Sequence, residues 1–452
     1  MILASTRKVS VVLSPKPLLW RLSPRRLVLL CIVAVGGAEP AFAEESARTE
    51  GVLTLQQALK QALSGNPGLQ EIRARADAAA AMPSQAGALP DPQLSFGALN
   101  IPSNTFNLRQ DEMTMMAVGV SQQIPFPGKL NLQEQAAELE AEAAAQSAEE
   151  ARLRLTRDVT IRWWQLFYLD RALMVNKDAQ TAFQALVDVA LAQYRAGEGL
   201  QQDVLIAQLE CSKLKDRLLE LIGIRHGEAA RLNALLNRSG NTAVRLPDTA
   251  DVLEPKLVAD TVLFETAGQT RPEIAQQRKA IDAARTRLEL AHKDYWPDLN
   301  VGAGYAFRQN APDGTFRSDF AEFRLSVNLP IYAGQKQSKA VDQRNSELLK
   351  EQFALEESLR KLQADITQAL ASYQHARERL ELFETDIVPQ AKQTVASLLA
   401  GYRTGQTDMN TLLRAETTAL DYEIQYWEAL ARSQQALAEM AAAVGEEKID
   451  EN

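Results

Sequence analysis

Cysteine, histidine, glycine and proline are all scarce in this chain. Among 452 residues there are 2 Cys, 3 His, 22 Gly and 18 Pro. Cys31 falls in an expected leader, so Cys211 would remain alone and an intrachain disulfide is excluded. Few Gly and Pro beside abundant Ala, Leu, Gln, Glu and Arg predict a mostly helical protein.

The residue patterns that enzymes use for chemistry are also missing. His226, His292 and His375 lie far apart, have no metal-ligand spacing, and are interpreted as helix surface. The sequence has no Gly-rich phosphate loop, no supported Ser-His-Asp or Cys-His set and no convincing carboxylate pair. We therefore expect no enzyme activity, no cofactor and no metal site.

Long apolar runs are confined to the N-terminus. Arg21, Arg25 and Arg26 precede an apolar run over residues 27–35, and small residues follow at 41–43. This pattern predicts a signal peptide over residues 1–43. A membrane anchor is the alternative, but it would need about 20 apolar residues, roughly twice this run. Lipidation of Cys31 is not expected, because no small residue precedes it.

The charge balance excludes another class of partner. The formal net charge is −9 at pH 7, and loss of the leader, where Lys and Arg outnumber Glu, makes the mature chain more acidic still. Acidic chains repel the phosphate backbone. We expect no nucleic-acid partner.

The chain contains an internal duplication. Several landmarks recur in the same order at an offset of about 205 to 208 residues, which indicates two copies of a whole subdomain. We therefore expect two structural repeats, residues 44–246 and 247–452. The paired landmarks are Asn66-Pro67 with Arg271-Pro272, Pro90-Asp91 with Pro297-Asp298, Ile124-Pro125 with Leu329-Pro330, Gly128 with Gly334, and Tyr194 to Gly197 with Tyr402 to Gly405.

Each repeat contains two segments that alternate between apolar and polar or small residues, as strands do. They cover residues 94–100 and 113–124, then 299–307 and 320–329. Strands of about ten residues can cross a bilayer when tilted; the alternative is a hairpin on a soluble core. Four strands cannot close a barrel, whereas three copies would supply twelve. A dimer or tetramer stays open at this stage.

Helical sequence surrounds the strands. Helices are expected over residues 55–89 and 272–296, and helical hairpins over about 130–238 and 335–444. The first arms of the hairpins, the second interrupted by Pro389, would reach on the order of 100 Å. Such charged, Ala-rich helices must pack on partner helices. A coiled-coil interaction protein without a pore is therefore the alternative from another class.

The ordered motifs resemble the TolC-like outer-membrane efflux factor family over nearly all of the mature chain. The resemblance implies an α+β membrane protein, with long α-helices forming a periplasmic α-barrel and four transmembrane strands per chain in a twelve-stranded trimeric β-barrel. It also implies a homotrimer in outer-membrane lipid that meets a periplasmic adaptor and an inner-membrane resistance-nodulation-division pump. The residues that carry it are Leu53-Thr54-Leu55-Gln56-Gln57-Ala58-Leu59, Asn66-Pro67, Pro90-Asp91-Pro92, Gln123-Ile124-Pro125 with Gly128, and both Tyr-x-x-Gly turns.

Two of these segments are most similar to the heavy-metal branch of that family. They are Leu89-Pro90-Asp91-Pro92-Gln93-Leu94 and Ser121-Gln122-Gln123-Ile124-Pro125-Phe126-Pro127-Gly128-Lys129. This resemblance implies a passive exit duct for heavy-metal cations delivered by the pump. Multidrug efflux and type I secretion are the alternatives within the channel class.

The hairpin turns are the candidate functional sites. In a trimer, Glu198, Asp203 and Asp408 would each recur three times at the periplasmic end, as acidic rings that attract cations or gate the mouth. Alternatively, Asp203 and Asp408 are helix caps. The resemblance assigns adaptor docking to the two turns, with Tyr194, Arg195, Gly197, Tyr402, Arg403 and Gly405 as the candidate residues.

A methionine cluster is a further candidate. Met113, Met115 and Met116 would suit a soft ion such as Cu(I) or Ag(I), although Met on a lipid-facing strand is usually plain apolar surface.

Overall fold

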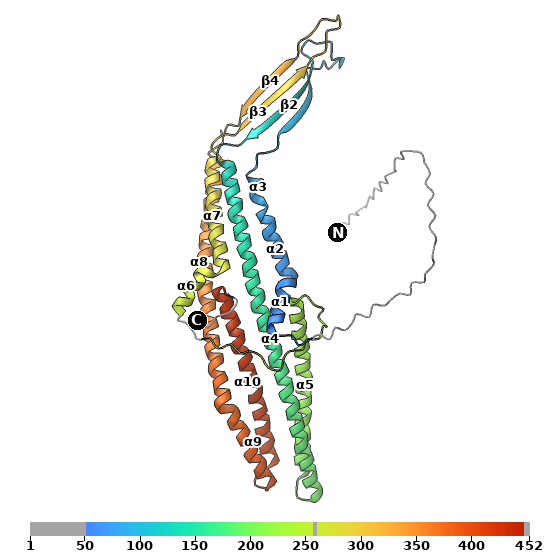
Figure 1. The fold of residues 1–452 in the computed structure, drawn as a ribbon, viewed down its shortest axis with the longest axis vertical. Helices are drawn as coiled ribbons and strands as arrows, with labels where there is room; N and C mark the ends of the chain where they lie inside the picture. The colour runs from blue at the N-terminus through green and yellow to red at the C-terminus, as the bar shows by residue number, and fades with distance from the viewer. Residues whose placement is uncertain (1–50, 256–259, 447–452) are drawn as a thin grey trace, which may run out of the picture. The chain divides into compact units, whose positions relative to one another are not determined.

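A computed structural model describes residues 51–255 and 260–446 (Figure 1). The expected signal peptide, residues 1–43, lies outside the described residues. In the part of the chain that is described, no helix combines the length and apolarity needed to span a bilayer.

The first helical segment is divided into three, whereas the sequence predicted one helix over residues 55–89. That prediction was wrong at Asn66-Pro67. The Asn66 side chain accepts a hydrogen bond from the Leu69 N–H at 3.0 Å, and Pro67 is the first helical residue after it. Proline has no N–H to continue a preceding helix, and Asn is a preferred cap. The three helices are α1 (Leu55–Gly65), α2 (Pro67–Ala80) and α3 (Met82–Ala86).

Four strands form one antiparallel sheet in the order β1-β2-β3-β4. Ser121 faces Gln93 on β1 and Gly302 on β3, and Ala303 on β3 faces Phe323 on β4. The sheet therefore joins the two halves of the chain through the central pair of strands. The strands are β1 (Gln93–Leu99), β2 (Met115–Ile124), β3 (Leu299–Phe307) and β4 (Phe320–Val327).

The two faces of the sheet differ in chemistry. The strand register places Phe96, Val120, Ala303 and Phe323 on one face, where Phe96 is 76% and Phe323 86% exposed. The opposite face carries small or polar residues over most of its length, and the larger apolar residues Leu99, Met115 and Phe320 lie at its end nearest the loops between strands. The small or polar residues are Ser95, Gly97, Gly119, Ser121, Gly302, Gly304, Glu322, Arg324 and Ser326. An exposed apolar face opposite a small, polar one is the pattern of a strand between lipid and water.

Long helices follow each pair of strands. In the first half, α4 (Lys129–Ala196) has 68 residues and α5 (Gln201–Leu235) returns beside it. In the second half, α6 (Asp260–Thr270) and α7 (Pro272–Lys293) precede β3. After β4 come α8 (Gln337–Leu382), a π-helical turn η1 (Phe383–Ile387), α9 (Val388–Arg403) and α10 (Met409–Val444). The π-helical turn ends just before Pro389, which cannot donate a helical hydrogen bond.

The junction between strands and helices is held by a buried cation. The Lys129 side chain is 7% exposed, and its Nζ lies 2.9 Å from Asp298 and 3.2 Å from Asp294. Asp298 also accepts the Phe126 N–H at 2.9 Å, and the Phe126 ring stacks on Trp296 at 5.2 Å. These contacts tie the start of α4 to the segment between α7 and β3.

Beyond this junction, the helices form a row and share a buried core. α2 packs on α4, α4 on α7, and α7 on α8. In the core, Phe167 of α4 stacks on Trp163, and Trp164 meets both rings edge-on. Trp163 also donates to the Leu53 carbonyl at 3.0 Å. The two hairpins, α4 with α5 and α8–α9 with α10, extend past this core to their turns.

Candidate functional site

The first turn joins α4 to α5 through a left-handed glycine. Gly197 has φ 79°, and its N–H donates to the Tyr194 carbonyl at 3.1 Å. The Gln193 carbonyl then accepts the N–H groups of Glu198 at 2.9 Å and Gly199 at 3.1 Å. These bonds satisfy carbonyls at the end of α4 that have no partner inside the helix.

The second turn joins α9 to α10 in a similar way. Gly405 has φ 73° and donates to the Tyr402 carbonyl at 3.1 Å, while Gln406 donates to Gly401 at 2.8 Å. Asp408 caps α10 by accepting the Thr411 N–H at 2.8 Å and the Thr411 hydroxyl at 2.7 Å. The repeated Tyr-x-x-Gly sequence therefore builds the same kind of turn twice.

The two turns are joined by a hydrogen bond that crosses between the halves of the chain. The Tyr402 hydroxyl donates to the Gln193 side-chain oxygen at 2.7 Å. Tyr402 is buried, with 6% of its surface exposed. Burial raises the pKa of Tyr402, and the negative charge of Asp203 raises it further, so the hydroxyl keeps its proton at neutral pH.

An apolar core lies directly behind this contact. It contains Ala190 of α4, Val204 of α5, and Met409 and Leu412 of α10, all of them buried together with Tyr402. A second polar contact joins the hairpins farther from the turns, because Arg217 of α5 lies 2.5 Å from Asp421 of α10. The ends of the two hairpins are thus held together by one buried hydrogen bond, an ion pair and apolar packing.

The three predicted acidic residues lie at these turns but in different settings. Glu198 is exposed in the first turn, and Asp203 is half-buried in the first helical turn of α5. Asp408 is exposed, and the Thr411 side-chain and backbone hydrogen bonds hold its pKa below the ordinary value. The alternative that both aspartates are helix caps is confirmed for Asp408, and the cap keeps it charged. It was wrong for Asp203, because Leu200 is the residue before α5 and no side chain caps that helix.

The six predicted docking residues lie in two different environments. Tyr194, Arg195, Gly197, Arg403 and Gly405 are exposed at the turns, whereas Tyr402 is buried and bonded to Gln193. Sequence analysis missed Gln193, Arg217 and Asp421. A Gln beside the Tyr-x-x-Gly motif was the available signal for Gln193.

The three methionines do not converge on one ion. Met115 and Met116 are neighbours in β2 and face opposite sides of the sheet, and Met113 precedes the strand. Alternate residues of a strand point to opposite faces, so the cluster in the sequence is not a cluster in space. Across the described residues, no group of three or more His, Cys, Asp or Glu side chains is arranged to hold a metal ion.

Comparison with known proteins places this geometry in a family. Residues 58–238 and 263–446 match the family model described as outer membrane efflux protein. No curated protein sequence matches the chain.

Solved structures give the fold independently. The chain is similar to the outer membrane protein VceC of Vibrio cholerae, with TM-score 0.73, 18% identity, and coverage of 87% of this chain and 96% of that one. It is also similar to the open state of the MtrE outer membrane channel of Neisseria gonorrhoeae, with TM-score 0.73, 18% identity, and coverage of 87% of this chain and 89% of that one. A third similar structure is CusC, with TM-score 0.74, 17% identity, and coverage of 87% of this chain and 92% of that one. The CusC structures are described as showing conformational changes that accompany folding and transmembrane channel formation. The predicted fold class, long helices with four strands in a two-part repeat, is confirmed.

Proposed function

Because the chain belongs to the outer membrane efflux protein family, we propose that it is the outer-membrane exit duct of a tripartite efflux system. A periplasmic adaptor and an inner-membrane resistance-nodulation-division pump deliver solute to the helical end, and the solute leaves passively through the strands. The observation that carries this proposal is the four-stranded sheet with one exposed apolar face and one small, polar face. That sheet continues into paired helices with polar turns.

The duct is proposed to be a homotrimer. β1 and β4 are the outer strands of the sheet, and each unpaired backbone group on such an edge would cost several kcal/mol in hydrocarbon. Pairing β4 of one copy with β1 of the next satisfies both edges. Three copies give twelve strands, enough to leave a lumen wider than side chains fill.

The turns are proposed as the regulated mouth. The Tyr402–Gln193 hydrogen bond holds the two hairpins together at their ends, so its loss lets the hairpins separate and the mouth dilate. The exposed residues Tyr194, Arg195, Gly197, Arg403 and Gly405 offer a surface for the adaptor. Docking there would supply the differential contacts that shift the mouth toward its open state.

Heavy-metal cations are the proposed substrate, and two features support them. The segments 89–94 and 121–129 are most similar to the heavy-metal branch. Glu198, Asp203 and Asp408 place three carboxylates per copy at the turns, where their field concentrates cations.

Planar-bilayer recording of the purified protein tests the acidic mouth. The variant Glu198→Gln, Asp203→Asn, Asp408→Asn removes three charges per copy, while Asn at 408 still caps α10. We expect its cation-to-anion permeability ratio to fall several-fold. The matched control neutralises exposed Glu138, Asp216 and Glu220, which lie away from the turns, and should keep the ratio. Equal ratios in both variants would exclude the acidic mouth, and absence of any conductance would exclude the duct.

Substrate class needs a separate test in cells. A strain lacking this chain should become sensitive to heavy-metal salts, and the wild-type chain should restore growth. Sensitivity to drugs with unchanged metal tolerance would replace the metal proposal with the multidrug alternative, and it would leave the duct itself in place.

A further inference from the structure

A polar pocket lies where helices from both halves of the chain meet. α4 belongs to the first half, and it packs on α7 and α10 of the second half, which in turn pack on α8. The end of α10 meets the start of α7, because the Thr270 hydroxyl donates to the Val444 carbonyl at 2.6 Å. Beside this joint is a pocket of about 360 Å³, within the size range of small-molecule sites.

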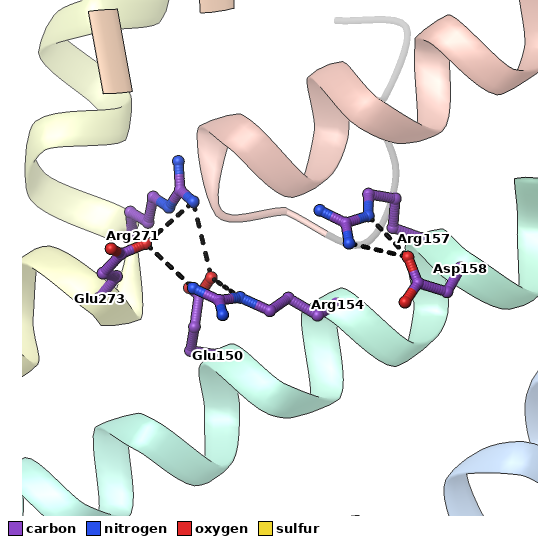
Figure 2. A network of polar contacts seen from close by, with 6 residues as sticks. All are labelled: Glu150, Arg154, Arg157, Asp158, Arg271 and Glu273. Carbon is purple, nitrogen blue, oxygen red and sulfur yellow. Dashed lines mark hydrogen bonds and ion pairs between the residues drawn. The ribbon is translucent and has the colours of Figure 1, made fainter. Parts of the chain in front are cut away.

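Two arginines and two carboxylates form a closed network at one side of the pocket (Figure 2). The Arg154 guanidinium of α4 lies 2.8 Å from the Glu150 carboxylate and 3.3 Å from that of Glu273. Arg271, just before α7, lies 3.0 Å from Glu273 and 3.6 Å from Glu150. Each guanidinium therefore meets both carboxylates, and the charges of these four residues cancel.

The rest of the pocket has a surplus of negative charge. Arg157 is paired with its neighbour Asp158 at 2.8 Å. Asp365 of α8 and Glu439 of α10 also line the pocket. Within the described part of the chain, neither of these two carboxylates makes an ion pair or a side-chain hydrogen bond. The pocket thus holds two negative charges that no arginine compensates.

A buried oxygen of Glu150 also lacks a partner. The Glu150 side chain lines the pocket and is 8% exposed. Its Oε1 meets Arg154 and Arg271, whereas its Oε2 is buried with no hydrogen-bond partner among the described residues. A buried acceptor without a donor is costly. A ligand that donates a hydrogen bond to Oε2 would remove that cost.

The arrangement of these carboxylates favours an amine over a metal ion. Glu150, Asp365 and Glu439 come from three different helices, and the described residues contain no three acidic or other ligating side chains placed to hold one metal ion. Two ammonium groups on a flexible chain reach separated carboxylates, and each has three donors. The C-terminal end of α10, at Ala442 and Ala443, lines the same pocket and favours positive charge.

An anion is the opposite interpretation, and the charge balance is against it. Arg271 Nε is buried without a partner, and α7 begins at Pro272 with no side-chain cap; both features favour an anion. The first turn of α7, however, already carries Glu273, which pairs with Arg271. The uncompensated carboxylates of Asp365 and Glu439 would repel a second anion.

We propose that this pocket binds a small dicationic amine, whose two ammonium groups are held by the carboxylates of Glu150, Asp365 and Glu439. The bound amine links α4 of the first half to α8 and α10 of the second half. It therefore stabilises the packing of the two halves against each other. The site is formed within one chain, so it depends neither on the duct nor on the solute that the duct carries.

Isothermal titration calorimetry of the purified protein with 1,4-diaminobutane tests the site. At constant ionic strength we expect one amine per chain, and no comparable binding of Mg²⁺ or sulfate. Asp365→Asn with Glu439→Gln removes the two uncompensated charges and leaves the arginine network intact. The affinity of this variant should fall about tenfold or more, because each lost contact is a charge-assisted hydrogen bond. The amine should also raise the unfolding temperature of the wild type more than that of the variant.

The matched control removes two charges from the same protein outside the pocket. Glu357→Gln with Glu378→Gln changes exposed residues of α8 that have no ion-pair partner among the described residues. The control should bind 1,4-diaminobutane as the wild type does. If the double variant in the pocket fails to fold, Glu439→Gln alone, at an exposed position of α10, serves in its place.

The other outcomes overturn the proposal in distinguishable ways. Equal losses in the pocket variant and the control would show that the amine responds only to overall charge. Stoichiometric binding of Mg²⁺ that the pocket variant abolishes would make this a metal site, and binding of sulfate that Arg157→Gln weakens would make it an anion site. Absence of all binding would leave the pocket without a ligand role, and the conductance of the same protein would still decide the duct.

Discussion

Tyr194 and Tyr402 stand three residues before matching left-handed glycines, yet their surroundings differ. Tyr194 is 44% exposed, whereas Tyr402 is 6% exposed and donates to Gln193 from the other half of the chain. The two motifs therefore form the same backbone turn, but their tyrosine side chains have different environments. One tyrosine is free to meet a partner, and the other links the two hairpins.

Replacing Tyr402 with Phe separates its hydrogen bond from its packing. Tyr402→Phe keeps the buried ring and removes the hydroxyl, and a hydrogen bond of this kind contributes about 1 kcal/mol, or roughly fivefold in an equilibrium. We expect the open probability in planar bilayers to rise about fivefold for each copy that must open. The control is Tyr194→Phe, which removes an exposed hydroxyl and should change little. Equal behaviour of the two variants would show that the hydrogen bond does not hold the mouth.

The limits of sequence reasoning are also clearest at this residue. The Tyr-x-x-Gly pattern predicted both turns, because a left-handed helix end favours glycine. The partner of Tyr402 is a side chain 209 residues away, and no local pattern specifies it. The acidic residues were located by their positions beside the predicted turns, and whether each one caps a helix required the geometry.

Among the elements, those with strong local signals were predictable and those decided by packing were not. The cleanest alternation lay over residues 299–307, where β3 forms. The break at Asn66-Pro67 was recognised as a repeat landmark and missed as a helix boundary, although Asn before Pro is a start signal. Pro389 predicts an interruption of the helix near the π-helical turn at Phe383–Ile387. No sequence pattern predicted that this interruption would be a π-helical turn.

The turns themselves can be tested through their glycines. Gly197→Ala and Gly405→Ala each put a Cβ on a residue with φ above 70°, which costs about 1–2 kcal/mol. Because the strain is local, we expect faster amide hydrogen exchange at the turns and little change in the core around Trp163. Gly197→Asn should recover part of the loss, since Asn tolerates this conformation.

The control for these glycines lies in the same hairpin. Gly223 is in α5 with ordinary helical geometry and open space around its Cα. Gly223→Ala should therefore stabilise the helix by about 0.5–1 kcal/mol. If Gly197→Ala behaved like Gly223→Ala, the left-handed turn would not be the conformation in solution.

At the scale of the whole molecule, the family assignment gives the sheet its environment. The outer membrane places one face of β1-β2-β3-β4 against lipid, and the exposed Phe96 and Phe323 mark that face. The small residues of the other face leave room for a lumen. The large exposed apolar area would favour aggregation in water. In the outer membrane it contacts lipid instead.

Two adjacent residues of β2 distinguish the faces. Val120 lies between Leu94 and Ala303 on the apolar face, and Ser121 lies between Gln93 and Gly302 on the opposite face. Val120→Arg should cost about 2–4 kcal/mol per copy near the bilayer midplane, and this cost is multiplied by the number of copies in the barrel. We expect the Val120→Arg protein to be lost from the outer-membrane fraction and to accumulate in the periplasm.

Ser121→Arg adds the same charge and volume one residue away and should remain in the outer membrane, with lower conductance because the side chain enters the lumen. Carbonate-washed membranes and single-channel currents measure both effects. If the two variants insert equally well, the face assignment is wrong. If Ser121→Arg alone is lost, the assignment is reversed, and the small, polar face is the one that meets lipid.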